Sequence, residues 1–284
     1  MVARESIEQY RRDSSQLSAL VAKELADYFG VLDLSRPEAV RDALMEFVPL
    51  LVAEYGQVAA ALALEWYEQL RFESGATGSY AAAAVLASVI TPERVEAKVR
   101  YAAGHLFDRE YEAKGADGGL IVVRKPAAPE KALSVLTSAT DKYVKQHGRE
   151  TVAWNAQSEG VRYARIPTGA KTCSFCLLLA SRDAVYLSEK SAGSKKYGPA
   201  NEFHGFCDCE ILPIRSVDDY PPGYLPDEYE SMYLDAAGDN GPEVRAFLES
   251  LDPDDKHRQL KAAVFSMRRK YPDAVTDGVL PHTH

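Results

Sequence analysis

Four cysteines and one histidine are the residues whose types and spacing could do chemistry in this chain. Cys173 and Cys176 form a Cys-x-x-Cys pair, and His204, Cys207 and Cys209 follow as His-x-x-Cys-x-Cys. A Cys-x-x-Cys turn presents two sulfur atoms on one side of a tight loop, and a second pair from a distant segment can complete a tetrahedron. Zinc favours such a set of sulfur and imidazole ligands. The spacing therefore predicts a zinc site with five candidate ligands for four places.

Two ligand sets are open at this point. Cys207 and Cys209 are two residues apart, so on a strand both would face the same side and both could bind. Alternatively, His204 could replace one of the cysteines. A full set of protein ligands is typical of a structural metal site. We therefore expect the zinc ion to stabilise a module that is too small to have a sufficient core of its own.

Other interpretations of the cysteines are weaker. A thioredoxin-type Cys-x-x-Cys would not need His204, Cys207 or Cys209. Unrelated buried cysteines would not cluster in one short window of a chain of 284 residues. A disulfide is disfavoured in a reducing cytoplasm, where we expect the chain to be made because its first residues lack the apolar core of a signal peptide. Metal binding is the prediction that fits all of these residues.

A cluster of basic residues surrounds the cysteines, although the formal net charge of the chain is −9. One interpretation is a solvated face, and the other is a contact with nucleic acid or with an acidic protein surface. The chain as a whole is too acidic for a DNA-binding protein with a uniformly basic surface. The candidate contact residues are Arg162, Arg165, Lys171, Arg182, Lys190, Lys195 and Lys196.

The elements that must position these residues are mostly helical. Apolar residues make up 46% of the chain and charged residues 26%, which allows a packed core. Ser35 is expected to cap a long helix that Pro49 kinks or splits, and Thr91 and Pro92 are expected to open another. The expected helices span 7–28, 37–75, 92–112, 131–157, 173–180, 227–234, 242–251 and 256–269, and the expected strands span 120–124, 163–167, 185–186 and 209–214.

We therefore predict a mainly α protein with three regions. Residues 1–158 form a helical domain, residues 159–216 a small α+β module stabilised by metal through its cysteine and histidine residues, and residues 217–284 an acidic helical tail with a frayed end. No membrane segment is expected, because Glu54 and Gln57 interrupt the longest apolar stretch, Leu50–Leu64.

The sequence lacks the common catalytic motifs. It contains no Gly-x-Ser-x-Gly, no His-Glu-x-x-His and no phosphate-binding loop. No pair of carboxylates in the sequence belongs to a recognisable catalytic motif. We therefore expect no catalytic residues, no cofactor other than structural zinc, and a protein that is not an enzyme.

Two segments resemble the signature of phage minor head proteins of the Mu F type, in the form found in tailed phages of actinobacteria. The first is Tyr163-Ala-Arg-Ile-Pro-Thr-Gly-Ala-Lys-Thr-Cys-Ser-Phe-Cys-Leu-Leu-Leu-Ala-Ser-Arg182, and the second is His204-Gly-Phe-Cys-Asp-Cys209. The resemblance implies a minor structural protein of the head interior that acts in head morphogenesis or in DNA packaging or ejection. It also implies the portal or the major capsid protein as partner, with DNA as a further one, and a passage from the host cytoplasm into the virion.

Two enzymatic alternatives remain beside this expectation. Some relatives of this family are described as capsid maturation proteases, and the basic residues beside a metal are also typical of a metal-dependent nuclease. A protease needs a nucleophile with a base, and a nuclease needs an open position on the metal. The sequence shows neither, which favours the structural role.

Overall fold

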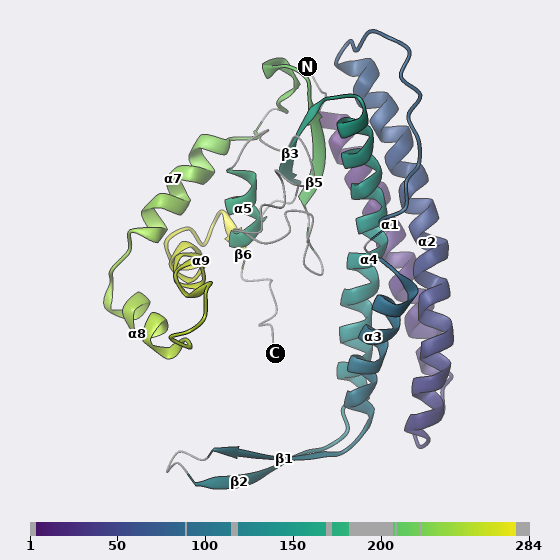
Figure 1. The fold of residues 1–284 in the computed structure, drawn as a ribbon, viewed down its shortest axis with the longest axis vertical. Helices are drawn as coiled ribbons and strands as arrows, with labels where there is room; N and C mark the ends of the chain where they lie inside the picture. Colours follow the sequence, from purple (N-terminus) through teal and green to yellow (C-terminus); the bar gives the residue numbers. More distant parts are fainter. Residues whose placement is uncertain are drawn as a thin grey trace. The chain divides into compact units, whose positions relative to one another are not determined.

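The computed structural model describes residues 4–88, 90–114, 119–168, 172–181, 207, 209–221 and 223–276. It is mainly helical with small two-stranded sheets, as the sequence predicted (Figure 1). The chain divides into two compact units. The helical unit comprises Arg12–Ala63 and Ala84–Thr151, and the cysteine unit comprises Met1–Arg11, Leu64–Ala83 and Val152–His284. The predicted regions 159–216 and 217–284 both belong to the cysteine unit.

Four helices build the core of the helical unit. They are α1 (Arg4–Gly30), α2 (Pro37–Glu73), α3 (Pro92–Ala103) and α4 (Pro129–Ser158), of which α1, α2 and α4 continue into the cysteine unit. Apolar side chains recur at helical spacing on each helix, and their buried faces meet in one cluster. Its fully buried members include Val21, Leu25, Leu44, Val48, Val99 and Leu136.

Pro49 does not split α2, which is continuous from Pro37 to Glu73. A proline inside a helix removes a hydrogen bond and strains the preceding turn. Here Val48 and Leu51 on either side of it are buried in the core, so packing holds both turns in place. The predicted cap was wrong as well, because the Ser35 hydroxyl donates to Asp33 (2.6 Å) and α2 begins at Pro37.

By length and composition, α2 would also be able to cross a membrane. The core helix of a soluble protein meets the same criteria. Leu44, Val48 and Val52 of α2 are buried in the core of the helical unit, and 39% of the apolar window of α2 is buried inside the protein.

The helix predicted to reach residue 112 ends earlier. Thr91 caps α3 as expected, since its hydroxyl accepts a hydrogen bond from the Arg94 N–H (3.3 Å). The helix stops at Ala103 and a 3₁₀ turn, η1 (Gly104–Leu106), follows. The next residues form strand β1 (Arg109–Lys114), antiparallel to β2 (Leu120–Lys125). Apolar and charged side chains alternate with period two along β1, the periodicity of a strand.

An extended segment near residues 80–88 is held along α4 by three polar side chains spaced one helical turn apart. Asn155 accepts from the Ala83 N–H (3.0 Å) and donates to the Ala83 carbonyl (2.8 Å). Thr151 makes the same two contacts with Val85 (3.0 and 2.8 Å). His147 Nδ1 accepts from the Ala87 N–H (2.9 Å). The backbone of the segment thus finds hydrogen-bond partners without a neighbouring strand.

The cysteine unit combines a strand pair with short helices. Strand β3 (Arg162–Pro167) is antiparallel to β5 (Cys209–Ile214), and β4 (Thr172–Cys173) is parallel to β6 (Val275–Thr276). Helix α5 (Ser174–Ala180) packs with α7 (Pro226–Ala237) and α9 (Arg258–Lys270), and α8 (Pro242–Ser250) packs on α9. Leu177, Ala236, Met267 and Val275 form their shared apolar core. The acidic region is helical, as predicted.

The contact between α2 and α4 in the helical unit yields the first prediction. A Cβ added at Gly56 would lie 2.4 Å from the His147 ring, which is buried and held by Ala87. Gly56→Ala should therefore lower the free energy of unfolding by about 1–3 kcal/mol, as overpacking does, although alanine is the better helix former. Urea unfolding measures this, with Gly104→Ala as control because that position is open. Equal stability of the two variants would contradict the close contact.

The same histidine predicts a pH dependence. Burial lowers the pKa of His147 below its ordinary value of 6.5, because the protonated ring would lose both its solvation and its role as acceptor for Ala87. A lowered folded-state pKa means that its contribution to stability is complete above pH 6.5 and is lost as the pH falls through the folded-state pKa. Urea unfolding at pH 7.5 and 5.5 should show a smaller loss for His147→Gln than for the wild-type chain. An equal loss would contradict this assignment.

Candidate metal centre

The cysteines of the two motifs converge in one buried cluster. Cys173 ends β4 and Cys176 lies in the first turn of α5, while Cys209 begins β5. The Sγ atoms of Cys176, Cys207 and Cys209 all lie within 4.8 Å of one another, and those of Cys176 and Cys207 are 3.2 Å apart. Sequence-distant segments thus bring their thiols to one point, as the motif predicted.

Cys173 lies beside this group of three, at the N-terminal end of α5. It is the N-cap of α5, and its Sγ accepts a hydrogen bond from the Cys176 N–H (3.3 Å). An N–H directed at a sulfur favours the thiolate, the form that binds metal. All four cysteines are reduced and at most 4% exposed. Hydrogen bonds from Cys176 to Cys173, Cys207 and Cys209, together with burial, raise the pKa of the Cys176 thiol well above its ordinary value.

This donor set fits a zinc ion. Tetrahedral zinc–sulfur bonds of about 2.3 Å place sulfur atoms about 3.8 Å apart. The three clustered sulfurs lie within 4.8 Å of one another, and those of Cys176 and Cys207 are closer than the zinc-bound spacing, at 3.2 Å. A cation would neutralise thiolates that are otherwise costly to bury together. Cys176, Cys207 and Cys209 would hold the ion, and Cys173, which lies outside this group of three, is, like His204, a candidate for the fourth ligand. His204 lies outside the described residues, so its position is not part of this geometry.

The strand pair fixes the position of the second cysteine pair. In the register of β3 and β5, Pro167 faces Cys209 and Arg162 faces Ile214. Every residue of β5 is buried, and Tyr163, Ala164 and Ile166 of β3 are at most 2% exposed. A one-residue slip would turn every side chain of β5 to the opposite face, so this packing also determines where Cys209 points.

The predicted basic cluster is only partly within the described residues. Arg162 is exposed at the start of β3, whereas Arg165 is 1% exposed. Arg165 therefore does not contribute to a charged surface, because β3 is buried on both faces. The other candidates, which are Lys171, Arg182, Lys190, Lys195 and Lys196, lie outside the described residues.

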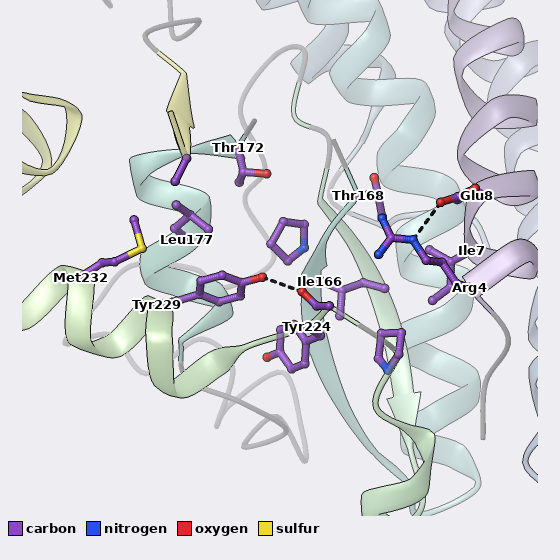
Figure 2. A pocket seen from close by; sticks show the side chains of 14 residues that line it. Arg4, Ile7, Glu8, Ile166, Thr168, Thr172, Leu177, Tyr224, Tyr229 and Met232 are labelled. Atoms are coloured by element: carbon purple, nitrogen blue, oxygen red, sulfur yellow. Dashed lines mark hydrogen bonds and ion pairs between the residues drawn. The ribbon is translucent and has the colours of Figure 1, made fainter. Parts of the chain in front are cut away.

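A pocket of about 270 Å³ lies in the cysteine unit (Figure 2). Ile166, Leu177 and Met232 form part of an apolar wall, and the ion pair of Arg4 and Glu8 (2.9 Å) lies on another side. Its described lining contains neither cysteine nor histidine. The pocket therefore adds no ligand of those types to the metal centre.

Comparisons with known proteins agree with a viral origin. The family model described as VG15 protein matches residues 1–236, which include both cysteine motifs. This chain belongs to the VG15 protein family. A curated relative, the Gene 15 protein of Mycobacterium phage D29, is 25% identical over 171 residues, or 50% of this chain. The match spans only 60% of that relative's length. No solved structure matches the chain.

A second cluster, for which the sequence carries no local motif, positions the strand pair of this VG15 family member. Glu159, just after α4, accepts hydrogen bonds from Tyr67 Oη (2.6 Å), Arg71 Nε (2.8 Å) and Arg215 (2.5 Å). Burial alone would raise the pKa of Glu159, but these three donors hold it below its ordinary value. All members belong to the cysteine unit. Arg215 directly follows β5, so the cluster fixes the end of the strand pair opposite Cys209.

The metal centre predicts a specific pattern of zinc content. We expect one zinc ion per chain and, with Cys173 as the fourth ligand beside Cys176, a four-sulfur spectrum after substitution with Co²⁺. Cys176→Ser should lose the metal and unfold the cysteine unit, whereas His204→Asn should keep both metal and spectrum. Elemental analysis, Co²⁺ absorption and circular dichroism measure these effects. Loss of zinc in His204→Asn would assign a ligand role to the histidine, and a stable metal-free Cys176→Ser variant would contradict the structural role.

Proposed function

We propose that this protein is a minor structural component of a phage head, associated with the portal or the major capsid protein on the interior side. In this role it acts in head morphogenesis or in DNA packaging or ejection. One observation carries the proposal: the motifs that resemble the minor head signature converge in a single buried cysteine cluster. Membership of the VG15 family and the phage relative support it.

The chemistry of the cysteine cluster favours a structural role over an enzymatic one. A metal ion held by four protein ligands has no position left for water or substrate. Its free energy of binding then stabilises the fold. On this proposal the ion joins β4 and α5 to the start of β5, and the chain is not an enzyme.

The proposed partners follow from the location. The protein is made in the infected host and then enters the head, where it contacts the portal or the capsid lining. Exposed Arg162 and the basic residues 171–196 of the same region would face packaged DNA or an acidic protein surface. On this proposal the strand pair β3–β5, held by the cysteine cluster at one end and by the Glu159 cluster at the other, supports that contact.

Purified particles test the proposal. In the phage that encodes this chain, mass spectrometry should find the protein in tailless heads as well as in complete virions, at far fewer copies than the major capsid protein. It should resist added protease until the heads are opened. Absence from both kinds of particle would contradict a head component.

Variants of the phage gene separate the structural role from the enzymatic alternatives. Cys176→Ser should reduce incorporation into heads, with Gly104→Ala as the control at an open position. Lys195→Ala combined with Lys196→Ala should leave the fold intact and tests the basic contact separately. Deletion of the gene should leave proteolytic processing of the major capsid protein unchanged. Loss of that processing would favour the maturation protease instead.

A further inference from the structure

The hairpin of β1 and β2 has no other strand beside it in the part of the chain that the structure describes. The two strands pair with each other in a sheet of their own. In Figure 1 they extend away from the ends of α3 and α4. A lone two-stranded hairpin is marginally stable in water. This one nevertheless exposes several large apolar side chains, namely Tyr111 (44%), Leu120 (71%), Ile121 (49%) and Val122 (61%).

The base of the hairpin is firmly attached to the helical unit. The His105 carbonyl accepts from the Ala128 N–H (2.7 Å), and the Asp108 carboxylate accepts from the Ala127 N–H (2.8 Å). His105 itself is buried, and its Nδ1 lies 3.0 Å from the Arg109 guanidinium. These contacts join the chain entering β1 to the chain leaving β2, so the strands start from a fixed position.

The two outer edges of the hairpin differ in charge. Along β1, charges of both signs occupy Arg109, Glu110, Glu112 and Lys114. Along β2, the run from Leu120 to Val123 is uncharged and rich in β-branched residues. Charged side chains on an edge strand discourage pairing with another chain, and an uncharged edge with high β-propensity permits it. The β2 edge is therefore the one open to a further strand.

We propose that the β2 edge pairs with the β2 edge of a second copy of this chain, in a four-stranded sheet of order β1-β2-β2-β1. A two-fold axis that passes through Val122 perpendicular to the sheet makes this pairing antiparallel. The same face of each hairpin then lies on the same side of the four-stranded sheet. Ile121 then lies opposite Val123 of the second copy, and Leu120 lies opposite its Arg124. No charged residue meets a like charge, and Arg124 keeps its ion pair with Glu110 (2.7 Å).

The charge pattern selects this arrangement over the others. Antiparallel self-pairing of β1 centred on Glu110, Tyr111 or Glu112 would place glutamates directly opposite each other, which is destabilising. If β2 of one copy paired with β1 of the next, the last copy in the assembly would always keep an unpaired β2 edge, unless the copies closed into a ring. The two-fold pairing of β2 leaves only the charged β1 edges facing solvent.

Disulfide formation at the two-fold axis tests the pairing in the full-length protein. Directly opposed residues of antiparallel strands have Cα atoms about 4.5–5.5 Å apart, within the range of a disulfide. Val122→Cys should therefore give a cross-linked dimer under mild oxidation. Leu120→Cys is the matched control, because its two copies would lie about 13 Å apart at about 3.3 Å per residue. Equal cross-linking of both variants, or of neither, would overturn the proposal.

Charge substitution gives an independent readout by sedimentation at equal protein concentration. Val122→Lys should shift the wild-type dimer to monomer, because two lysines would meet at the axis. The hairpin itself should stay intact, since the new lysine lies opposite Glu112 in the register of β1 and β2. The double variant Glu112→Lys/Val122→Glu reverses this pair and should also be monomeric.

A mixture of Val122→Lys with the double variant should recover the dimer, because opposite charges then meet at the axis. A monomeric wild-type chain, a dimer that persists in both variants, or a mixture that stays monomeric would each overturn the proposal.

Discussion

The position of the cysteine strand pair depends on one carboxylate. Glu159 lies between the guanidinium groups of Arg71 and Arg215 and also accepts from Tyr67. All three charged side chains are largely buried, at about 15% exposure. A buried charge without its partner costs several kcal/mol, so loss of this carboxylate would leave two cations together in a poorly solvated place. The end of α2, the end of α4 and the residue after β5 therefore form one connected base.

The cysteine cluster acts at the opposite end of the same strands. Strand β3 begins beside Glu159 and runs to Pro167, which faces Cys209. The strand pair is thus held by an ionic cluster where β5 ends and by sulfur atoms where β5 begins. A sheet of only two strands is marginally stable in water. The ionic cluster, the cysteine cluster and burial on both faces compensate for the absence of further strands beside β3 and β5 in the described residues.

Local patterns in the sequence predicted most of the helices and the cysteine cluster. The Cys-x-x-Cys spacing and the period of two between Cys207 and Cys209 are short-range signals. The Glu159 cluster had no such signal, because Arg215 lies 56 residues further along the chain. Arg165 was assigned to a charged surface because basic residues are usually exposed, but β3 is covered on both faces. The prediction of one helix over 92–112 passed over two local signals, which are Gly104 at the C-cap of α3 and the alternation of apolar and charged side chains along β1.

The path of the extended segment near residues 80–88 depends on polar side chains of α4. His147, Thr151 and Asn155 bind the backbone of residues 83, 85 and 87, and Asn155 also accepts a hydrogen bond from the Tyr80 hydroxyl (3.0 Å). The information that determines the path of this segment therefore resides largely in the helix. Substitution of His147, Thr151 or Asn155 would remove hydrogen bonds from this backbone, whereas Ala87 matters through its buried side chain. A search for the determinants of this loop should begin some sixty residues downstream of it.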